Sequence, residues 1–419
     1  MTASERRQVV VIGAGPAGAI ASALLARRNR DVLVLERERF PRFSIGESLL
    51  VHCLDFIEEA GMLEAVAAAG FQHKNGAAFA CAGEYGDFDF REGFTPGRVS
   101  TYEVERAPFD GLLAAEAQRQ GVEIRFATQI VGVECVAGRT PRVELTARGP
   151  DGALETLGAD FVLDASGYAR TLARLLALER PSEFPSRHAL FTHVADRIEA
   201  DGFDRNKILI TVHPLHRDVW YWLIPFSGGR SSIGVVGSAE RLQIPAGSLD
   251  ERLRRLVSED ERLGRLLAGA VWDTPARALG GYAANVTTMH GPGFALLGNA
   301  AEFLDPVFSS GVTIAMRSAS LAAHNVDREL GGAEVDWERD FERPLRVGID
   351  CFREFVRAWY DGRLLEIFLS GSRGSQIRGM ICSVLAGYAW DERNPFVTDP
   401  KRRLDALAQL CAARRGPRT

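Results

Sequence analysis

The chain has 419 residues, of which 46% are hydrophobic and 25% are charged, so it is long enough for two or three structural regions around sizeable cores. The formal net charge of -5 argues against a nucleic-acid or anionic-membrane partner, because such partners need a concentrated basic surface. The six cysteines form no CxxC pair, and the eight histidines show no metal-binding spacing, so we expect reduced cysteines and no metal site. A small-molecule or carrier-bound substrate fits this composition best.

The sequence carries no recognisable targeting or membrane-spanning segment. Residues Met1 to Gln8 are short and polar and lack the apolar core of a signal peptide. The most apolar late stretch, Met380 to Trp390, is too short to span a bilayer. We therefore expect a cytoplasmic protein without a membrane span.

The first 36 residues are typical of a βαβ unit that binds a dinucleotide. A strand (Val9 to Ile12), a glycine turn, a helix (Ala17 to Arg28) and a second strand (Asp31 to Leu35) follow one another, and Glu36 closes the unit. Glycines in this turn allow a pyrophosphate to approach the backbone and the helix N-terminus, while an acid after the second strand can accept a ribose hydrogen bond. The residues predicted to bind the cofactor here are Gly13, Gly15, Ala17, Gly18 and Glu36. This motif alone fits NAD as well as FAD.

The next segments alternate between helical and strand-like patterns. Residues 47–69 have helical spacing and predict one long helix that ends at Gly70, residues 71–102 predict strands and loops, and Phe109 to Gly121 predicts an amphipathic helix. Strand-like runs return over 122–163 and over about 188–236. A buried strand is predicted at Phe294 to Leu297.

From Val312 to the end the pattern is helical, with a long helix over Trp337 to Leu369 that Pro344 interrupts. The aromatic residues of this helix could form a lid over a substrate pocket or pack against the first domain. We expect an α/β fold in which a Rossmann-type FAD-binding domain is interleaved with a β-rich substrate domain. The predicted ranges are 1–74, 104–180 and 285–330 for the FAD-binding domain, 75–103 and 181–284 for the substrate domain, and 331–419 for a helical C-terminal region.

Two further motifs favour FAD. Asp164-Ala165-Ser166-Gly167 and Gly298-Asn299-Ala300-Ala301 resemble the second and third FAD-contact motifs of the aromatic-hydroxylase superfamily. The resemblance implies cofactor contacts by Asp164, Gly167, Gly298 and Asn299, and by Arg106, which resembles an arginine that contacts the flavin nucleotide. The third motif of that superfamily normally carries Asp, which bonds the ribityl chain, and Asn299 can still accept such a bond through its amide oxygen.

Within this superfamily, three segments resemble the flavin-dependent halogenases of phenols and pyrroles. Trp220 to Pro225 reads WxWxIP, Asp305 to Val312 reads DPVFSSGV, and Gly46-Glu47-Ser48 matches a GES element. On a strand, Trp220, Trp222 and Ile224 share one face, which the resemblance places beside the substrate together with Phe308. It also implies flavin contacts by Ser48, Gly311 and Val312, and a halide held by the backbone amides at Ser310 and Gly311, where a helix start suits an anion.

Lys74 is the candidate catalytic residue. It matches the halogenase active-site lysine in Phe71-Gln72-His73-Lys74-Asn75-Gly76-Ala77. The chain has only three lysines among 50 basic residues, so arginines number 50 minus 3, or 47. A lysine that is kept where arginine serves elsewhere is more apt to be needed as an amine, whose pKa burial can lower.

The resemblance implies halogenation of an electron-rich aromatic in secondary metabolism. Reduced FAD, oxygen and chloride or bromide would give hypohalous acid, which Lys74 would position or activate. No second nucleotide motif is visible, so a separate flavin reductase is the expected partner. Phe308 stands where tryptophan halogenases carry a glutamate, which favours a phenol or pyrrole, free or tethered to a carrier protein. The alternative is a non-halogenating FAD-dependent monooxygenase or oxidoreductase of the same fold.

Overall fold

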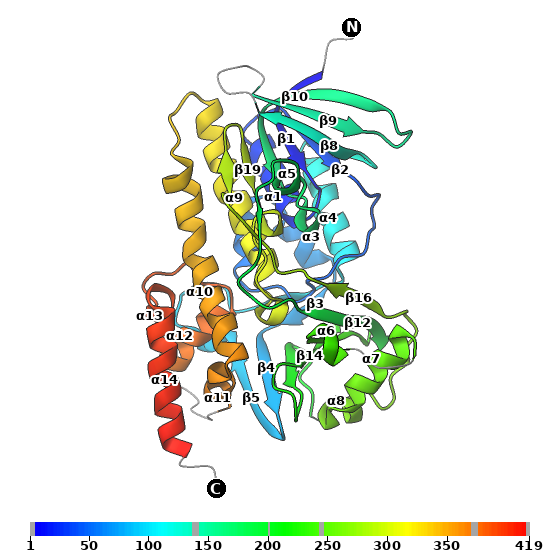
Figure 1. Ribbon diagram of the computed structural model, residues 1–419, viewed down its shortest axis with the longest axis vertical. Coiled ribbons are helices and arrows are strands. Elements are labelled where there is room, and N and C mark those ends of the chain that lie inside the picture. Colours follow the sequence, from blue (N-terminus) through cyan, green and yellow to red (C-terminus); the bar gives the residue numbers. More distant parts are fainter. Residues whose placement is uncertain (1–4, 136–141, 200–201, 243–246, 370–375, 416–419) are drawn as a thin grey trace.

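The computed structural model describes residues 5–135, 142–199, 202–242, 247–369 and 376–415. It has the mixed α/β fold that the sequence predicts, with two large sheets and a group of helices near the C-terminus (Figure 1). In Figure 1 the first sheet lies above the second, and the long helix α10 (Arg343–Tyr360) runs beside both. Within the described ranges no helix combines the length and apolar character that a bilayer crossing requires.

The first sheet has eight strands and a parallel centre in the order β18-β19-β10-β1-β2-β7. Its opening unit is β1 (Glu5–Ile12), α1 (Pro16–Ala26) and β2 (Val32–Glu36), as predicted. The long strand β10 (Leu154–Asp164) pairs in parallel with β1 and β19 and in antiparallel with β9. The other strands are β7 (Glu123–Phe126), β8 (Gln129–Cys135), β9 (Val143–Arg148), β18 (His290–Gly291) and β19 (Phe294–Leu296).

The second sheet has seven strands in the order β16-β12-β15-β14-β13-β4-β5. These are β4 (Gly76–Cys81), β5 (Glu84–Asp89), β12 (His188–Ala195), β13 (Lys207–Val212), β14 (Trp220–Phe226), β15 (Arg230–Gly237) and β16 (Arg277–Gly280). Two short pairs complete the strands: β3 (Gln72–Lys74) with β6 (Thr101–Glu103), and β11 (Glu179–Arg180) with β17 (Asn285–Val286). The division of the chain into two interleaved domains stays a prediction.

The segment 47–69 is a correction to the sequence analysis, which predicted one helix. Its first residues instead pair with β6, since Ser48 bridges Glu103 and the amide of Leu49 donates to the carbonyl of Tyr102. Two short helices follow, α2 (Cys53–Glu59) and α3 (Leu63–Ala68). Gly61 separates them with a φ of 70°, a conformation that ends a helix and that glycine adopts without strain.

The remaining helices cover the two sheets. They are α4 (Arg106–Arg119), α5 (Thr171–Leu175), α6 (Ala239–Leu242), α7 (Leu249–Ser258), α8 (Glu261–Leu266), α9 (Ser310–Leu330), α11 (Arg363–Phe368), α12 (Gln376–Leu385), α13 (Pro395–Thr398) and α14 (Pro400–Arg415). Single turns lie at Phe90–Glu92, Gly167–Ala169, Gly298–Ala300 and Pro306–Phe308, and a π-helical turn at Glu338–Glu342 precedes α10. Pro344 lies in the first turn of α10, directly after the π-helical turn.

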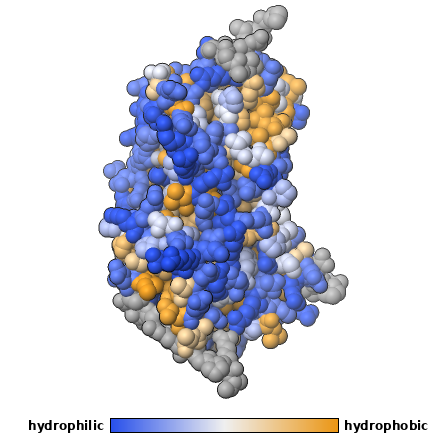
Figure 2. All heavy atoms as spheres, turned by 60° about the vertical axis from the view of Figure 1, so that its left-hand side comes forward, coloured by the Kyte–Doolittle hydropathy of each residue, from blue (hydrophilic) through white to orange (hydrophobic). Residues whose placement is uncertain are grey.

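Helix α10 packs its apolar side inward and leaves its polar side to solvent. Phe352 and Phe355 are completely buried, and Trp359 is 4% exposed, which favours the packing alternative over a lid. The outer face of the molecule on this side is mostly hydrophilic, with isolated hydrophobic patches (Figure 2). One core cluster joins the first sheet to these helices, and a second lies between the other face of the second sheet and α7.

The first βα turn gives a test of the fold. A Cβ at Gly18 would lie 1.9 Å from the carbonyl oxygen of Gly13, so Gly18→Ala should force the turn apart and lower the free energy of unfolding by about 2 kcal/mol or more. Gly111→Ala in α4 is the matched control, because a Cβ there meets no atom within 4 Å. It should raise stability by about 0.5–1 kcal/mol. Equal denaturation midpoints for the two variants would contradict this description of the turn.

Candidate functional site

A cavity of about 640 Å³ lies where the first sheet meets the second. Its walls come from segments that the sequence analysis singled out separately. Thirteen of the predicted site residues line it: Gly13, Gly15, Ala17, Glu36, Ser48, Arg106, Gly167, Trp220, Trp222, Ile224, Asn299, Gly311 and Val312. The other six, Gly18, Lys74, Asp164, Gly298, Phe308 and Ser310, lie outside its lining.

The glycine turn brings backbone to the cavity at the end of β1. Gly13 has a φ of 98°, and a Cβ there would lie 2.7 Å from the carbonyl oxygen of Ala165. Gly15 caps α1 without a side chain, so the first amides of that helix stay available to an anion. The Glu36 carboxylate accepts from the amide of Ala14 at 2.8 Å and borders the cavity. These groups fit the pyrophosphate and ribose of a dinucleotide.

Asp164 holds the second motif in shape from behind. One carboxylate oxygen accepts from the amide of Ser166 at 2.9 Å and the other from the amide of Leu172 at 2.7 Å. The side chain is fully buried, and burial raises its pKa although both bonds act in the opposite direction. Asp164 therefore orders the loop that presents Gly167 to the cavity, and its predicted contact with FAD stays a prediction.

Asn299 connects the second motif to the third and to α9. Its side chain lies beside the hydroxyl of Tyr168, and its amide oxygen would lie 3.6 Å from a Cβ at Gly311. Burial raises the pKa of Tyr168 to about 12, so this hydroxyl is a neutral hydrogen-bonding group at ordinary pH. Gly298 lies behind Asn299 against Ala315 of α9. Asn299 thus faces the cavity with an amide oxygen that can accept a bond.

Arg106 begins α4 and is held firmly on the cavity wall. Two of its nitrogens bond the carboxylate of Asp110 at 2.8 and 2.9 Å, and a third donates to the carbonyl of Ile45 at 2.5 Å. The guanidinium is 7% exposed. Because its charge is matched by Asp110, Arg106 is better suited to shaping the site than to attracting an anion.

The N-terminus of α9 adjoins the same cavity. Ser309, the residue before the helix, has a left-handed φ of 55°. Its side chain accepts no hydrogen bond from the amides of the first helical turn. Ser309, Gly311 and Val312 line the cavity, whereas Ser310 is 3% exposed and lies outside the lining. The aligned amides and the helix dipole make this end of α9 suitable for an anion.

The strand β14 supplies an aromatic wall. Trp220, Trp222 and Ile224 line the cavity, while Tyr221 and Leu223 belong to the core cluster behind the sheet, as the period-two pattern predicts. The indole of Trp222 donates to the hydroxyl of Ser232 at 3.0 Å. Phe308 does not reach this wall, because it packs edge-on against Phe355 and Trp359 of α10.

A hydrogen-bonded chain joins this wall to the loop before α9, and the sequence analysis missed it. The Trp220 indole donates to the Tyr360 hydroxyl at 3.1 Å, and that hydroxyl donates to the Asp305 carboxylate at 2.8 Å. The other oxygen of Asp305 accepts from the amide of Val307 at 3.0 Å. Burial raises the pKa of Asp305 to about 6, although the bond from Tyr360 acts in the opposite direction.

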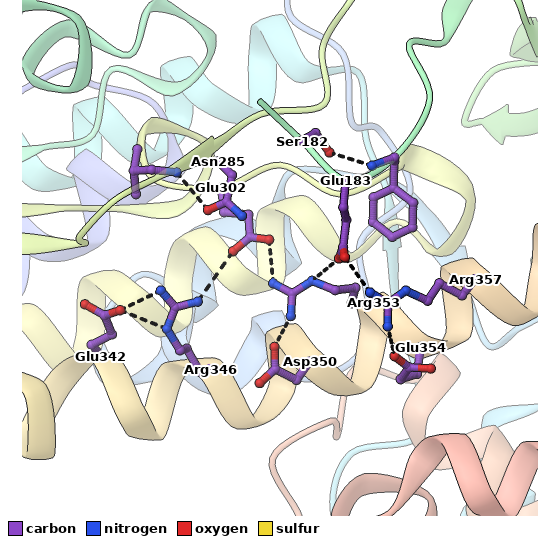
Figure 3. A network of polar contacts seen from close by, with 12 residues as sticks. Ser182, Glu183, Asn285, Glu302, Glu342, Arg346, Asp350, Arg353, Glu354 and Arg357 are labelled. Atoms are coloured by element: carbon purple, nitrogen blue, oxygen red, sulfur yellow. Dashed lines mark hydrogen bonds and ion pairs between the residues drawn. The ribbon is translucent and has the colours of Figure 1, made fainter. Parts of the chain in front are cut away.

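Ion pairs from α10 hold the third motif from its outer side (Figure 3). The Glu302 carboxylate, directly after that motif, accepts from Arg353 at 2.5 Å, and Arg353 also bonds Glu183 at 2.9 Å. Arg346 bonds Glu342 at 2.6 Å within the helix. Because these partners lie 51 and 170 residues from Arg353 in the chain, no local pattern in the sequence could have identified them.

A possible metal cluster is disfavoured by its existing partners. His290, Glu338 and Glu342 bring ligand atoms within 4.8 Å of one another. However, Glu342 already accepts from Arg346 and from the amide of Met289. A cation at this cluster would have to compete with the arginine.

Lys74 lies on β3, enclosed beside the cavity. Its side chain is 1% exposed, and its Nζ donates to the carbonyl of Leu49 at 2.9 Å and lies 5.6 Å from the ring centre of Phe90. Burial lowers the pKa of Lys74 to about 8. Ser48 lines the cavity and is the direct neighbour of Leu49, whose carbonyl accepts from Lys74. Lys74 is therefore separated from the cavity by this short segment of chain.

Comparisons with known proteins agree with this geometry. The sequence profile of the FAD-binding domain family matches residues 6–333. The chain is 32% identical over 346 residues to a tryptophan 2-halogenase of Chondromyces crocatus, with 78% of this chain and 62% of that protein covered. It is 28% identical over 432 residues to a 1H-pyrrole-2-carbonyl-(peptidyl-carrier protein) chlorinase of Pseudomonas fluorescens, with 96% and 93% covered.

A solved structure gives a similar result. A flavoprotein/dehydrogenase from Cytophaga hutchinsonii is 40% identical to this chain and superimposes with a TM-score of 0.93, with 97% of this chain and 99% of that chain covered. The glycine turn, the acidic residue after β2 and the cavity beside them therefore have the setting in which FAD is bound in such folds.

The raised pKa of Asp305 predicts a pH-dependent stability difference. The carboxyl of Asp305 holds its proton more tightly in the folded protein than in the unfolded chain, where its pKa is about 4. This preference stabilises the folded protein fully below about pH 4, and the stabilisation is lost as the pH rises through about 6. Relative to the wild type, Asp305→Asn should therefore gain up to about 3 kcal/mol between pH 4 and pH 7. If the variant also loses the hydrogen bond from Tyr360, its stability falls by the same amount at both pH values, which leaves the pH dependence unaffected. Denaturation curves at both pH values measure it, and parallel pH dependence in the two proteins would contradict the prediction.

Proposed function

This chain belongs to the family of FAD-binding domain proteins and is related to flavin-dependent halogenases, and on that premise we propose that it halogenates an electron-rich aromatic compound. The proposed co-substrates are oxygen and chloride or bromide, with reduced FAD from a separate flavin reductase. The observation that carries this proposal is the N-terminus of α9, a helix start suited to an anion, which borders the same cavity as the FAD motifs and the Trp220–Trp222 wall.

FAD, bound in reduced form, would supply two electrons that reduce oxygen to the peroxide level, and oxygen at that level can oxidise halide to hypohalous acid. In this proposal the amides before and in the first turn of α1 hold the pyrophosphate, and Glu36 accepts from the ribose. Asn299 accepts from the ribityl chain. The amides at Ser310 and Gly311 hold the halide by charge and hydrogen bonding. Trp220 and Trp222 keep the aromatic substrate on the far side of the cavity wall.

Lys74 is the proposed group that carries the electrophile to the substrate. Its amine can donate a hydrogen bond to hypohalous acid or accept halogen at nitrogen, and its lowered pKa increases the fraction of free amine at neutral pH. Since Lys74 does not line the cavity, hypohalous acid has to pass Ser48 to reach it. A phenol or a pyrrole is the proposed substrate, and the relationship to a chlorinase of a carrier-bound pyrrole makes a tethered pyrrole worth testing.

A second candidate is a flavoprotein of the same fold that hydroxylates or dehydrogenates its substrate. Two observations favour it: the enclosure of Lys74, and the 40% identity to a structure described as a flavoprotein/dehydrogenase. Both functions use FAD, and their products distinguish them.

Incubation of the purified protein with a flavin reductase, NADH, oxygen and bromide separates the two functions. Monochlorodimedone, simple phenols and a carrier-bound pyrrole serve as acceptors, and mass spectrometry identifies the products. The proposal predicts bromide-dependent brominated products with the bromine isotope pattern. Hydroxylated or dehydrogenated products alone, with normal FAD turnover, would rule halogenation out.

Lys74→Met tests the role of the amine. Methionine fills the buried space without a charge, so FAD absorbance should be retained while halogenation falls by about 100-fold or more. Lys401→Met on the exposed side of α14 removes another of the three lysines and should leave both properties unchanged. Continued halogenation by an FAD-loaded Lys74→Met protein would mean that Lys74 does not handle the electrophile.

A further inference from the structure

Lys74 belongs to a small sheet that borders the cavity. Its strand β3 pairs with β6, and β6 continues beside residues 47–49. The amide of Leu49 donates to the carbonyl of Tyr102 at 3.1 Å, and the amide of Val104 donates to the carbonyl of Glu47 at 2.7 Å. Three short segments that are distant in the chain therefore form one continuous surface.

One face of this small sheet carries four buried polar side chains. Lys74 lies opposite Thr101, and Ser48 lies opposite Glu103, while Thr101 and Glu103 are two residues apart on one strand. All four are at most 3% exposed. The hydroxyls of Ser48 and Thr101 and both carboxylate oxygens of Glu103 have no hydrogen-bond partner among the described residues. A wholly buried carboxylate in this condition is unusual enough to require a function or a counter-charge.

The charged groups that face Glu103 leave Lys74 as its counter-charge. They are Lys74, Arg205 and Asp204. Arg205 bonds both carboxylate oxygens of Asp196, at 3.0 and 2.9 Å, so its charge is already compensated. Asp204 carries the same charge as Glu103 and cannot stabilise it.

The groups that face Lys74 lead to the same pairing. They are Glu103 and the Cys53 thiol, and burial raises the pKa of Cys53 to about 11, so that thiol is neutral. The hydrogen-bond acceptor of Nζ, the carbonyl of Leu49, is also neutral. Glu103 is thus the negative group opposed to Lys74, and no direct ion pair joins the two.

A carboxylate that is buried on the same face as an ammonium stabilises the charged form of that ammonium. Burial acts in the opposite direction and lowers the pKa of Lys74 to about 8, while the charge of Glu103 raises it. Without Glu103, the pKa of Lys74 would therefore lie lower still.

We propose that Glu103 is a positioning residue whose carboxylate sets the protonation state of Lys74 by stabilising its ammonium form across this face. The consequence for chemistry rests on the proposed function, in which a neutral amine is the form that accepts halogen. Ser48 lies on the same face and borders the cavity, so the pair adjoins the place where the electrophile is made. Tryptophan halogenases carry a glutamate at the position of Phe308. In this chain the carboxylate on the face of Lys74 comes instead from Glu103 on β6.

Selective labelling tests the pair without any turnover. With only three lysines, protein labelled with ¹³C at lysine Cε gives three resonances, and Lys74→Met assigns that of Lys74. In the wild type, the Lys74 resonance should titrate near pH 8. The Lys207 resonance should titrate at higher pH, because burial lowers the pKa of Lys207 but its bond to Asp204 more than offsets that effect. In Glu103→Gln, loss of the negative charge should lower the Lys74 midpoint by about one to two pH units.

Matched variants separate the pair from a general disturbance. Glu103→Met, which fills the same space without polar atoms, should lower the midpoint as Glu103→Gln does, and Glu103→Asp should restore it. Glu105→Gln, two residues away, should leave it unchanged, as should the Lys207 resonance in every variant. An unchanged Lys74 midpoint in both Glu103→Gln and Glu103→Met would overturn the proposal. Because the readout needs no flavin turnover, its result does not depend on whether the protein halogenates.

Discussion

The close parallel packing of β1, β10 and β19 is the constraint on which the site depends. Parallel strands end at the same edge of a sheet, so the loops that follow them meet there. The contact is tight, because Gly13 lies against the carbonyl of Ala165 with no room for a side chain. Three sequence segments that are more than 130 residues apart from one another therefore line one cavity, and the start of α9 follows directly from the third.

The C-terminal helices complete this arrangement. Tyr360 of α10 connects Trp220 of the second sheet to Asp305 of the loop before α9, while Arg353 holds Glu302 after the third motif. One helix thus fixes the loop that presents the proposed halide site at two points. Buried and multiply bonded partners of this kind make the loop rigid, which suits a site that must place an anion beside a flavin.

The sequence predicted the elements with a strong local pattern. The βαβ unit follows from its glycine spacing and apolar runs, and the face shared by Trp220 and Trp222 follows from the alternation on a strand. The helix predicted over 47–69 was wrong, because helical spacing does not reveal that Ser48 pairs with Glu103 across the small sheet. Tyr360, Arg353 and Glu103 were missed for a similar reason. Their roles come from tertiary neighbours rather than from spacing, and Asp164 turned out to bond its own loop.

The burial of Lys74 agrees with the sequence analysis, but its separation from the cavity could not be read from the sequence. Its Nζ donates to the carbonyl of Leu49, and Glu103 lies on the same face of the small sheet, opposite Ser48. The proposed chemistry therefore divides into two compartments, a cavity for flavin and halide and a dry polar face for the amine. Such a division would keep hypohalous acid away from bulk water until it meets the substrate.

The central claim is that flavin and halide meet at the N-terminus of α9. Anomalous scattering from crystals of the FAD complex soaked in bromide tests it most directly. The account predicts FAD along the strand ends of the first sheet and a bromide peak within hydrogen-bond distance of the backbone amides of Ser310 and Gly311. Bound FAD with no bromide at that helix start, or with bromide only at surface arginines, would contradict it.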